Sequence, residues 1–337
     1  MSSDAPQPRN ADLSHLFQDH MPYAGWMVEG AFRFDQHLLL LMQFLVQYCP
    51  SRRISRALGA PPCIWSLDMY GTRRMLHPDY CESVIATYAQ QQVGLVLNFD
   101  NPLPPADSLE DPLGHRLIRS LLQHNPTGRN AVCVASEALA ALLRERYPSL
   151  PLICHQHRLM LCTGKRTPAL YEKLGESYRE IILHPRDAVN PAFFSLLPNP
   201  WKYIAVANDP VPRTFAVRRE LLHLLAELRL RPWDSSLIER KEKLADRAGI
   251  FSIKDTANLS RCEESALYSA GIRSFLLQSF SFRNELTLLW DLFHHLFRTR
   301  PEYANEVALI SSAAMAHIRE HENGLPSGFN LFTFADN

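Results

Sequence analysis

Short runs of β-branched and aliphatic residues recur along the chain, and most end in a polar residue and precede a stretch with helical periodicity. Apolar runs of this length, bounded by turn residues, are typical of strands buried on both faces. Strands that alternate with helices pair in parallel through right-handed crossovers. Eight such runs occur, at residues 28–32, 63–68, 93–100, 130–136, 151–157, 180–184, 202–209 and 272–278.

Eight strand–helix units are the number that closes a (β/α)8 barrel, so the sequence predicts an α/β protein of this TIM-like class. A capping residue followed by proline favours a helix start, as at Thr167-Pro168 and Asn190-Pro191. Further helices are expected at residues 36–48, 78–91, 112–124, 137–147, 215–230 and 260–270.

The length and composition fit one large domain. A chain of 337 residues that is 46% hydrophobic can bury a core of barrel size. We expect a disordered leader over residues 1–14 and a single barrel over 15–337, with an insertion at 231–259 before the last strand. Extra C-terminal helices are predicted at 284–298 and 302–322. The polar start has no signal-peptide pattern and no apolar run is long enough to span a bilayer, which predicts a cytoplasmic protein.

Charge and cysteine usage exclude several classes of function. Lys+Arg and Asp+Glu both number 35, so no general nucleic-acid or membrane binding is expected. A small-molecule or peptide substrate is the expected partner, with a partner protein as a further candidate. The seven cysteines form no C-x-x-C pair, which indicates reduced thiols and no iron–sulfur cluster. Nucleotide-binding and zinc-peptidase motifs are absent from the sequence.

The strongest local signal is the pair of histidines in His155-Gln156-His157, at the end of the fifth predicted strand. Residues two apart on a strand share a face, and neutral imidazoles bind divalent metals. With Asp100 as an oxygen donor, this set predicts a site for iron, manganese or zinc. The alternative is a chance pair in which one histidine is buried and hydrogen-bonded and the other faces loops.

Other polar residues follow the predicted strands, where barrel enzymes carry their chemistry. Asp68, His184 and Asp209 are the candidates for acid–base catalysis, because a low-dielectric mouth shifts their pKa values. Lys254 in the insertion is a candidate Schiff-base amine. The candidates for substrate contact are Glu29, Asn98, Arg158 and Asn208. Capping of the following helices is the alternative role for such polar residues.

The chain contains the segments ALLRERYPSLPLICHQH, YEKLGESYREIILHPRDAVNPAFFSLL, KYIAVANDPVPRTFAVRRELLHLL and SALYSAGIRSFLLQSFSFRNELTLLWDLF in this order. Together they resemble the barrel of the peptidase U32-like family over roughly residues 60 to 300. The resemblance implies a barrel with peptidase or hydroxylation chemistry. In the iron–sulfur members cysteines follow the strand that corresponds to KYIAVAND, whereas Pro210-Val211-Pro212-Arg213 stands here. The cluster ligands therefore do not carry over.

Three hypotheses follow from these residues. The first is a metal-dependent enzyme that modifies or cleaves a small molecule or short peptide at the C-terminal face of the barrel, as a biosynthetic enzyme or a U32-like hydrolase. The second is a metal-free lyase, isomerase or hydrolase that uses the same polar residues. The third is a barrel without catalysis that binds a peptide or a partner enzyme.

Overall fold

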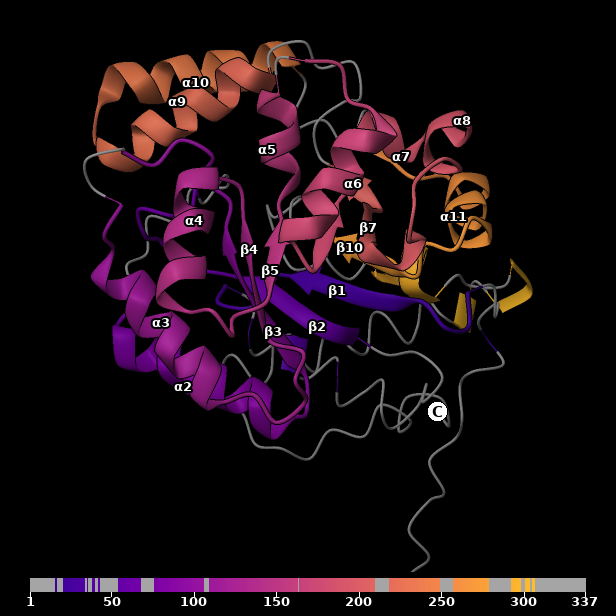
Figure 1. Cartoon of the computed structure of the whole chain (residues 1–337), viewed down its shortest axis with the longest axis horizontal. Helices are drawn as coiled ribbons and strands as arrows, with labels where there is room; N and C mark the ends of the chain where they lie inside the picture. The colour runs from indigo at the N-terminus through magenta and orange to yellow at the C-terminus, as the bar shows by residue number, and fades with distance from the viewer. Residues whose placement is uncertain are drawn as a thin grey trace, which may run out of the picture.

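A computed structural model shows a closed barrel of eight parallel strands (Figure 1). It describes residues 21–33, 54–67, 76–105, 109–162, 164–209, 218–248, 257–278, 292–297 and 301–303, with single positions at 16, 35, 38, 39, 42, 305 and 306. The predicted fold class is confirmed. In order around the barrel the strands are β1 (Gly25–Glu29), β10 (Ser274–Leu277), β7 (Tyr203–Val206), β6 (Glu180–Ile182), β5 (Leu152–Cys154), β4 (Ala131–Val134), β3 (Gly94–Phe99) and β2 (Ile54–Gly59).

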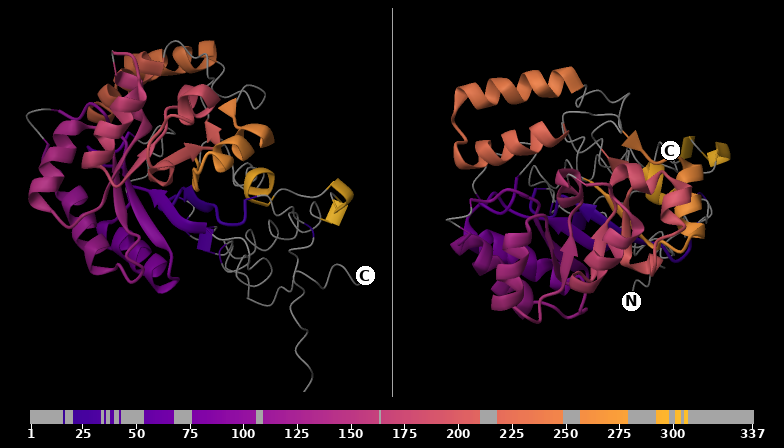
Figure 2. Two further views of the ribbon diagram at one scale, coloured as in Figure 1. Left: turned by 45° about the vertical axis from the view of Figure 1, so that its right-hand side comes forward. Right: turned by 45° about the horizontal axis from the view of Figure 1, so that its top comes forward.

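Helices follow the strands and cover the outside of the barrel (Figures 1 and 2). None of the helices in the described part of the chain is long and apolar enough to cross a membrane. The helices between the strands are α2 (Pro78–Gln90), α3 (Pro112–Gln123), α4 (Glu137–Arg146), α5 (Gln156–Leu161), α6 (Pro168–Ser177), α7 (Pro185–Ala188), α8 (Pro191–Phe194), α9 (Arg218–Leu230), α10 (Ser235–Ala248) and α11 (Arg261–Ser269).

Local sequence signals set the helix starts. Asp111 caps α3 by accepting hydrogen bonds from the backbone N–H groups of Leu113 and Gly114. Thr167 caps α6 in the same way, and Ser260 forms a capping box with Glu263 at α11. These bonds satisfy backbone donors that have no partner within the helix. The predicted starts at Pro112, Pro168 and Pro191 are confirmed.

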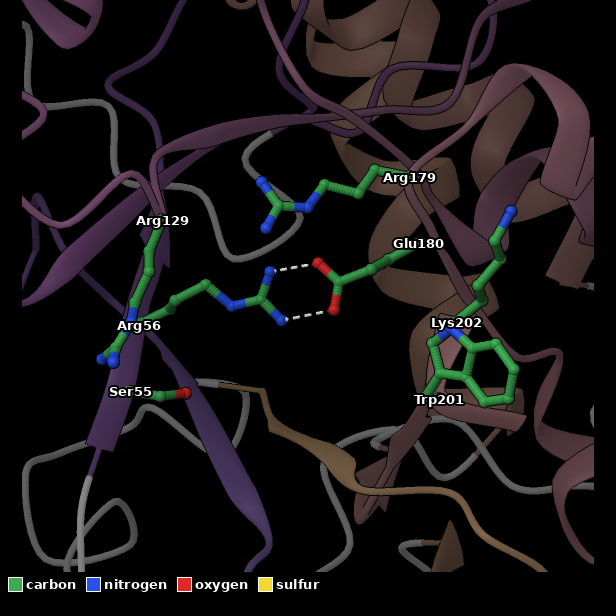
Figure 3. Close-up of a pocket in the computed structure, with 7 residues that line it drawn as sticks. All are labelled: Ser55, Arg56, Arg129, Arg179, Glu180, Trp201 and Lys202. Carbon is green, nitrogen blue, oxygen red and sulfur yellow. Dashed lines mark hydrogen bonds and ion pairs between the residues drawn. The ribbon is translucent and has the colours of Figure 1, made fainter. Parts of the chain in front are cut away.

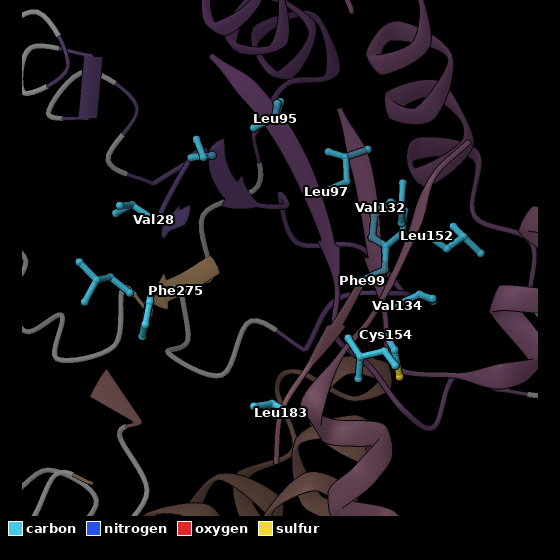
Figure 4. Packing of buried hydrophobic residues seen from close by; sticks show 14 of the residues in the cluster. Val28, Leu95, Leu97, Phe99, Val132, Val134, Leu152, Cys154, Leu183 and Phe275 are labelled. Carbon is cyan, nitrogen blue, oxygen red and sulfur yellow. The ribbon is translucent and has the colours of Figure 1, made fainter. Parts of the chain in front are cut away.

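Two apolar clusters lie on the two faces of the barrel wall. The outer cluster packs strands against helices and includes Phe99, Val134 and Phe275 (Figure 4). The inner cluster fills the barrel with alternate residues of the same strands, among them Met27, Val96 and Ile153. Because both faces are buried, the strands read as nearly continuous apolar runs, which is why the pattern reveals most of them.

The second predicted strand is wrong. The run at 63–68 lies in a loop, and β2 is Ile54–Gly59 instead. Backbone and side-chain bonds hold the loop against the segment after β3: Trp65 O accepts from Asn101 N, and Asp100 Oδ1 accepts from Leu67 N. An apolar run bounded by turn residues is therefore buried here as a packed loop. The sequence pattern does not predict β2, because Ser55 and Arg56 in its first half interrupt the apolar run.

The segment before the last strand forms two helices and a short ribbon. Helices α9 and α10 lie side by side at one end of the molecule (Figures 1 and 2). The charged stretch at 239–247 falls on α10, where Glu239 and Arg240 are exposed. β8 (Asn208–Asp209) pairs antiparallel with β9 (Ala257–Asn258). The leader at 1–14, Asp68, Lys254 and most of the two predicted C-terminal helices lie outside the described residues.

Candidate functional site

Six polar residues lie at or just after the carboxyl ends of the strands. Side chains alternate between the two faces of a strand, and each of these residues lies two positions after a member of the inner apolar cluster. Five of the six are buried, and Glu29 is half-buried. This polar ring consists of Glu29, Asn98, His155, His184, Asn208 and Gln278.

The structure brings Asp100, His155 and His157 together beside the ring. Their candidate ligand atoms all lie within 4.8 Å of one another, and all three residues are buried. The two imidazole rings are 4.2 Å apart between centroids in an edge-to-face arrangement. The predicted grouping of these three residues is therefore present in the fold.

The reason for the grouping differs from the prediction, because the two histidines do not share a strand. β5 ends at Cys154, His155 is the N-cap of α5, and His157 lies in the first turn of that helix. The His155 Nδ1 atom accepts a hydrogen bond from the His157 backbone N–H at 3.1 Å. The turn of the helix start, rather than strand alternation, places the rings against each other.

Hydrogen bonds define the tautomers of the two rings. His157 Nδ1 lies 2.9 Å from the Asp100 carbonyl oxygen, which can only accept, so Nδ1 carries the proton. His157 Nε2 then has the lone pair. His155 has the opposite arrangement when neutral, with its proton on Nε2, because Nδ1 accepts the capping bond.

Burial keeps both imidazoles neutral. Burial is the largest cause that lowers the pKa of His157 to about 4; the hydrogen bond to Asp100 opposes this shift and the nearby Arg218 cation adds to it. Burial, together with His157, also holds the pKa of His155 well below its usual range. Neutral imidazole is the form that binds metals, so no deprotonation is needed at neutral pH.

The donor set fits a divalent transition metal. Two imidazoles and a carboxylate are ligands that zinc, iron and manganese accept. Asp100 Oδ1 accepts from Leu67 N at 2.8 Å, and Oδ2 lies 3.9 Å from His157 Nδ1. The hydrogen bonds that hold the Asp100 carboxylate and the His157 ring are of the kind that orients the ligands in metal sites.

The remaining members of the ring are held in pairs. Asn98 Nδ2 donates to Glu29 Oε1 at 3.2 Å, which links β3 to β1. Asn208 donates to the Gln278 carbonyl at 2.8 Å and accepts from the Gln278 N–H at 2.6 Å. Buried Asn98 Oδ1 and Gln278 Oε1 have no hydrogen-bond partner among the described residues. Such acceptors usually bind water or a ligand.

Asp209 is buried next to the ring and is paired with a cation. Arg218 at the start of α9 donates to Asp209 Oδ2 at 3.0 Å. At the other end of α9, Arg229 Nε donates to the Ser66 carbonyl at 2.7 Å. These two contacts fix α9 between β8 and the loop after β2. The ion pair with Arg218 therefore gives Asp209 a structural role, which is to hold the start of α9.

His184 is the N-cap of α7, and a buried network holds it. Its Nδ1 atom accepts from the Arg186 N–H at 3.2 Å, and its backbone N–H donates to the Tyr171 hydroxyl at 3.1 Å. That hydroxyl donates to Asp187 at 2.8 Å, and Arg166 pairs with the same carboxylate at 2.7 Å. Burial first, then the cations Arg166, Arg218 and Arg186, lower the pKa of His184 to about 3.

We expect Tyr171→Phe to lower the free energy of unfolding by about 2 kcal/mol, because it leaves the buried His184 N–H without its acceptor. Urea unfolding monitored by circular dichroism measures the loss. Tyr203→Phe is the matched control, since the Tyr203 hydroxyl makes no hydrogen bond within the described part of the chain and its ring is equally buried. Equal losses in the two variants would contradict the role of this bond.

Arg158 is placed away from the ring. Its guanidinium pairs with Glu137 and Tyr178, which lie at the start of α4 and the end of α6. Three further residues near the site, Gln278, Arg218 and Arg166, were not predicted from the sequence. Gln278 ends the eighth predicted run and could have been found by the same strand alternation that places Asn98. The two arginines had no local signal, because their partners are distant in the sequence.

The described cysteines are free thiols, and four of them are buried: Cys63, Cys81, Cys133 and Cys154. Burial raises the pKa of Cys154, which ends β5 beside the histidines, to about 12. A thiol in this state is a poor nucleophile and a poor metal ligand at neutral pH. The candidate functional groups at the mouth are therefore the imidazole, carboxyl and amide groups.

Two solved structures are similar to this chain in fold. The chain is similar to the solved U32 peptidase Mk0906, with 13% sequence identity and a TM-score of 0.48 over 83% of this chain and 98% of that chain. It is also similar to an oxaloacetate acetylhydrolase in complex with the product oxalate, with 10% identity and a TM-score of 0.39 over 93% and 96% of the chains. No protein-family model and no curated protein matches the sequence.

Proposed function

We propose that this protein is a metal-dependent enzyme that acts on a small molecule or short peptide at the carboxyl ends of the barrel strands. The observation that carries the proposal is the buried group of Asp100, His155 and His157. A divalent ion bound there would polarise a substrate carbonyl or lower the pKa of a water molecule. The U32-like segments support a hydrolase among the reaction types.

The polar ring supplies the other functions of the proposed site. The Glu29–Asn98 pair and the Asn208–Gln278 pair face the axis and offer oxygen acceptors to N–H or O–H groups of a substrate. His184, neutral and with Nδ1 used as an acceptor, presents an Nε2–H donor. Together these groups would orient a polar substrate beside the ion.

Metal binding can be tested with variants that keep the local hydrogen bonds. His155→Asn preserves an N-cap acceptor, His157→Asn preserves a side-chain N–H donor, and Asp100→Asn preserves the acceptor for Leu67 N–H. We expect untagged wild-type protein to take up about one equivalent of zinc or manganese in calorimetric titration. Each variant should lose affinity by at least about tenfold, as expected when a ligand is lost.

His77→Gln is the control, because His77 is an exposed histidine at the N-cap of α2, with 73% of its side chain accessible. It should bind metal like the wild type. A folded wild type that takes up no zinc, manganese or iron would contradict the proposal, as would variants that bind as tightly as the wild type. Circular dichroism of each variant verifies folding.

A second function is metal-free acid–base catalysis in the same ring, and one observation favours it. The His155 Nδ1 lone pair is occupied by the capping bond, so binding a metal through Nε2 would require the ring proton to move and that bond to break. Without a metal, His155 is an Nε2–H donor next to the Nε2 lone pair of His157. Activity that survives chelation but is lost in His157→Asn would establish this second function.

A further inference from the structure

The amino-terminal end of the barrel contains a cavity of about 490 Å³, at the opposite end from the polar ring. Its lining comes from the residues that begin or precede strands β2, β4, β6 and β7 (Figure 3). Sites at this end of a barrel usually serve stability rather than chemistry. The residues found here are unusual for that role: Arg56, Arg129, Arg179, Glu180, Trp201 and Lys202.

The cavity carries an excess of positive charge. Four of the lining residues are cations, and Glu180 is the one carboxylate among the residues that line it. Arg56 and Glu180 point into the barrel and pair with each other, with Arg56 Nη2 donating to Oε1 at 2.8 Å, so these two charges cancel. Their side chains are only 12% and 13% exposed. Three positive charges therefore remain without compensation inside the cavity.

Two of these cations are available to a ligand. The guanidinium groups of Arg129 and Arg179 make no hydrogen bond or ion pair to any residue that the structure describes, and both residues are exposed. Lys202 Nζ donates to the Gly175 carbonyl at 2.7 Å, a neutral acceptor that does not cancel a positive charge. Guanidinium groups bind phosphate oxygens with two parallel hydrogen bonds.

The cavity also has an aromatic surface. The Trp201 side chain stands at the opposite wall of the cavity from Arg56 and Arg129 (Figure 3). It is 63% exposed, although tryptophan usually buries most of its surface. An exposed indole beside a polar cavity is typical of a binding surface for a flat ring.

We propose that this cavity binds an organic phosphate of nucleotide size, with the phosphates on Arg129 and Arg179 and the base against the Trp201 indole. A volume of about 490 Å³ lies within the range of small-molecule sites, roughly 300 to 1,000 Å³. The site is separate from the metal-binding group at the mouth, so a ligand here would act as a regulator or an accessory group rather than as the substrate.

Calorimetric titration with ADP, pyrophosphate and adenosine, in the presence of EDTA, tests the site without any contribution from metal at the mouth. We expect ADP to bind best, pyrophosphate more weakly and adenosine least. The affinity for ADP should fall as salt is raised, because exposed charges are screened. The Arg129→Gln/Arg179→Gln variant should lose at least about tenfold in affinity for both phosphates, in proportion to the lost charge-assisted bonds.

Two matched controls separate the site from general charge and surface effects. Arg240→Gln removes one exposed cation on α10 and should bind ADP like the wild type. Trp201→Leu should weaken ADP binding and leave pyrophosphate binding unchanged. Trp233→Leu should alter neither, although Trp233 is 74% exposed.

The proposal fails if neither ADP nor pyrophosphate binds at millimolar concentration, or if the double arginine variant binds as the wild type does. Equal affinity for ADP and adenosine would also overturn it, because the phosphates would then contribute nothing. Loss of ADP binding in Arg240→Gln would point to nonspecific attraction and overturn it as well. None of these results depends on metal binding by His155 and His157, so the two proposals fail independently.

Discussion

Replacement of Gly114 by alanine is expected to lower the free energy of unfolding by about 2–3 kcal/mol, the upper part of the range for overpacking a tight core. A Cβ atom at this position would lie 2.3 Å from Cε3 and Cζ3 of Trp65. The indole cannot move aside, because it is fully buried and its Nε1 donates to the Leu109 carbonyl at 2.7 Å. The clash outweighs the gain of up to about 1 kcal/mol that alanine normally brings to a helix interior.

Gly175→Ala in α6 is the matched control. The nearest atoms to a Cβ there are Lys202 Cδ and Nζ at 3.8 Å, which is ordinary contact with a flexible side chain. This variant should be as stable as the wild type or more stable by up to about 1 kcal/mol. Urea unfolding measures both variants under the same conditions. Equal stability of Gly114→Ala and Gly175→Ala would show that the packing of Trp65 against α3 is wrong.

The Trp65 contact also explains where sequence reasoning failed. Cys63, Trp65 and Leu67 are all buried, so the apolar pattern was a correct sign of burial. It predicted the wrong element because the burial comes from contacts with residues that are distant in the sequence. Trp65 packs edge-on against Phe99 and His115. A local pattern cannot distinguish a packed loop from a strand when both are short and apolar.

Strand β2 shows the opposite failure. Arg56 points into the barrel, where it pairs with Glu180, which follows it by 124 residues. A charged residue at an interior position breaks the apolar run, and only the partner on β6 makes the position acceptable. The other seven strands have apolar residues on both faces, and their runs predicted them with shifts of a few residues at the ends.

The sequence predicted which residues lie at the candidate site better than it predicted how their side chains are oriented. The rule that barrel chemistry follows the strands selected Glu29, Asn98, Asp100, His155, His184 and Asn208, and the fold brings these to one mouth. It also selected Arg158, whose charge is paired among the outer helices. The orientation of a side chain after a strand depends on where the next helix begins. If the helix begins one residue earlier or later, the side chain points in a different direction.

Acid destabilisation through His184 is the second large effect that we expect. Burial and three cations lower its folded-state pKa to about 3, whereas an unfolded chain has the usual value of about 6.5. Between these values the unfolded state binds the additional proton, so stability falls as the pH drops from about 6.5 toward 3. At pH 4.5 the loss from this single group amounts to about 3 kcal/mol, at roughly 1.4 kcal/mol per pH unit.

His184→Asn isolates this contribution, because asparagine can still accept the capping bond from Arg186 N–H while it carries no titratable group. Urea unfolding at pH 7 and pH 4.5, both in EDTA, should show a smaller difference for the variant than for the wild type by about 3 kcal/mol. His77→Asn is the control, since His77 caps α2 through the same Nδ1 contact, to Asp79 N–H at 3.3 Å, but is exposed. The His77 variant should keep the wild-type pH dependence. If His184→Asn also keeps it, the imidazole is not buried as the fold places it, and the polar ring at the mouth loses one of its members.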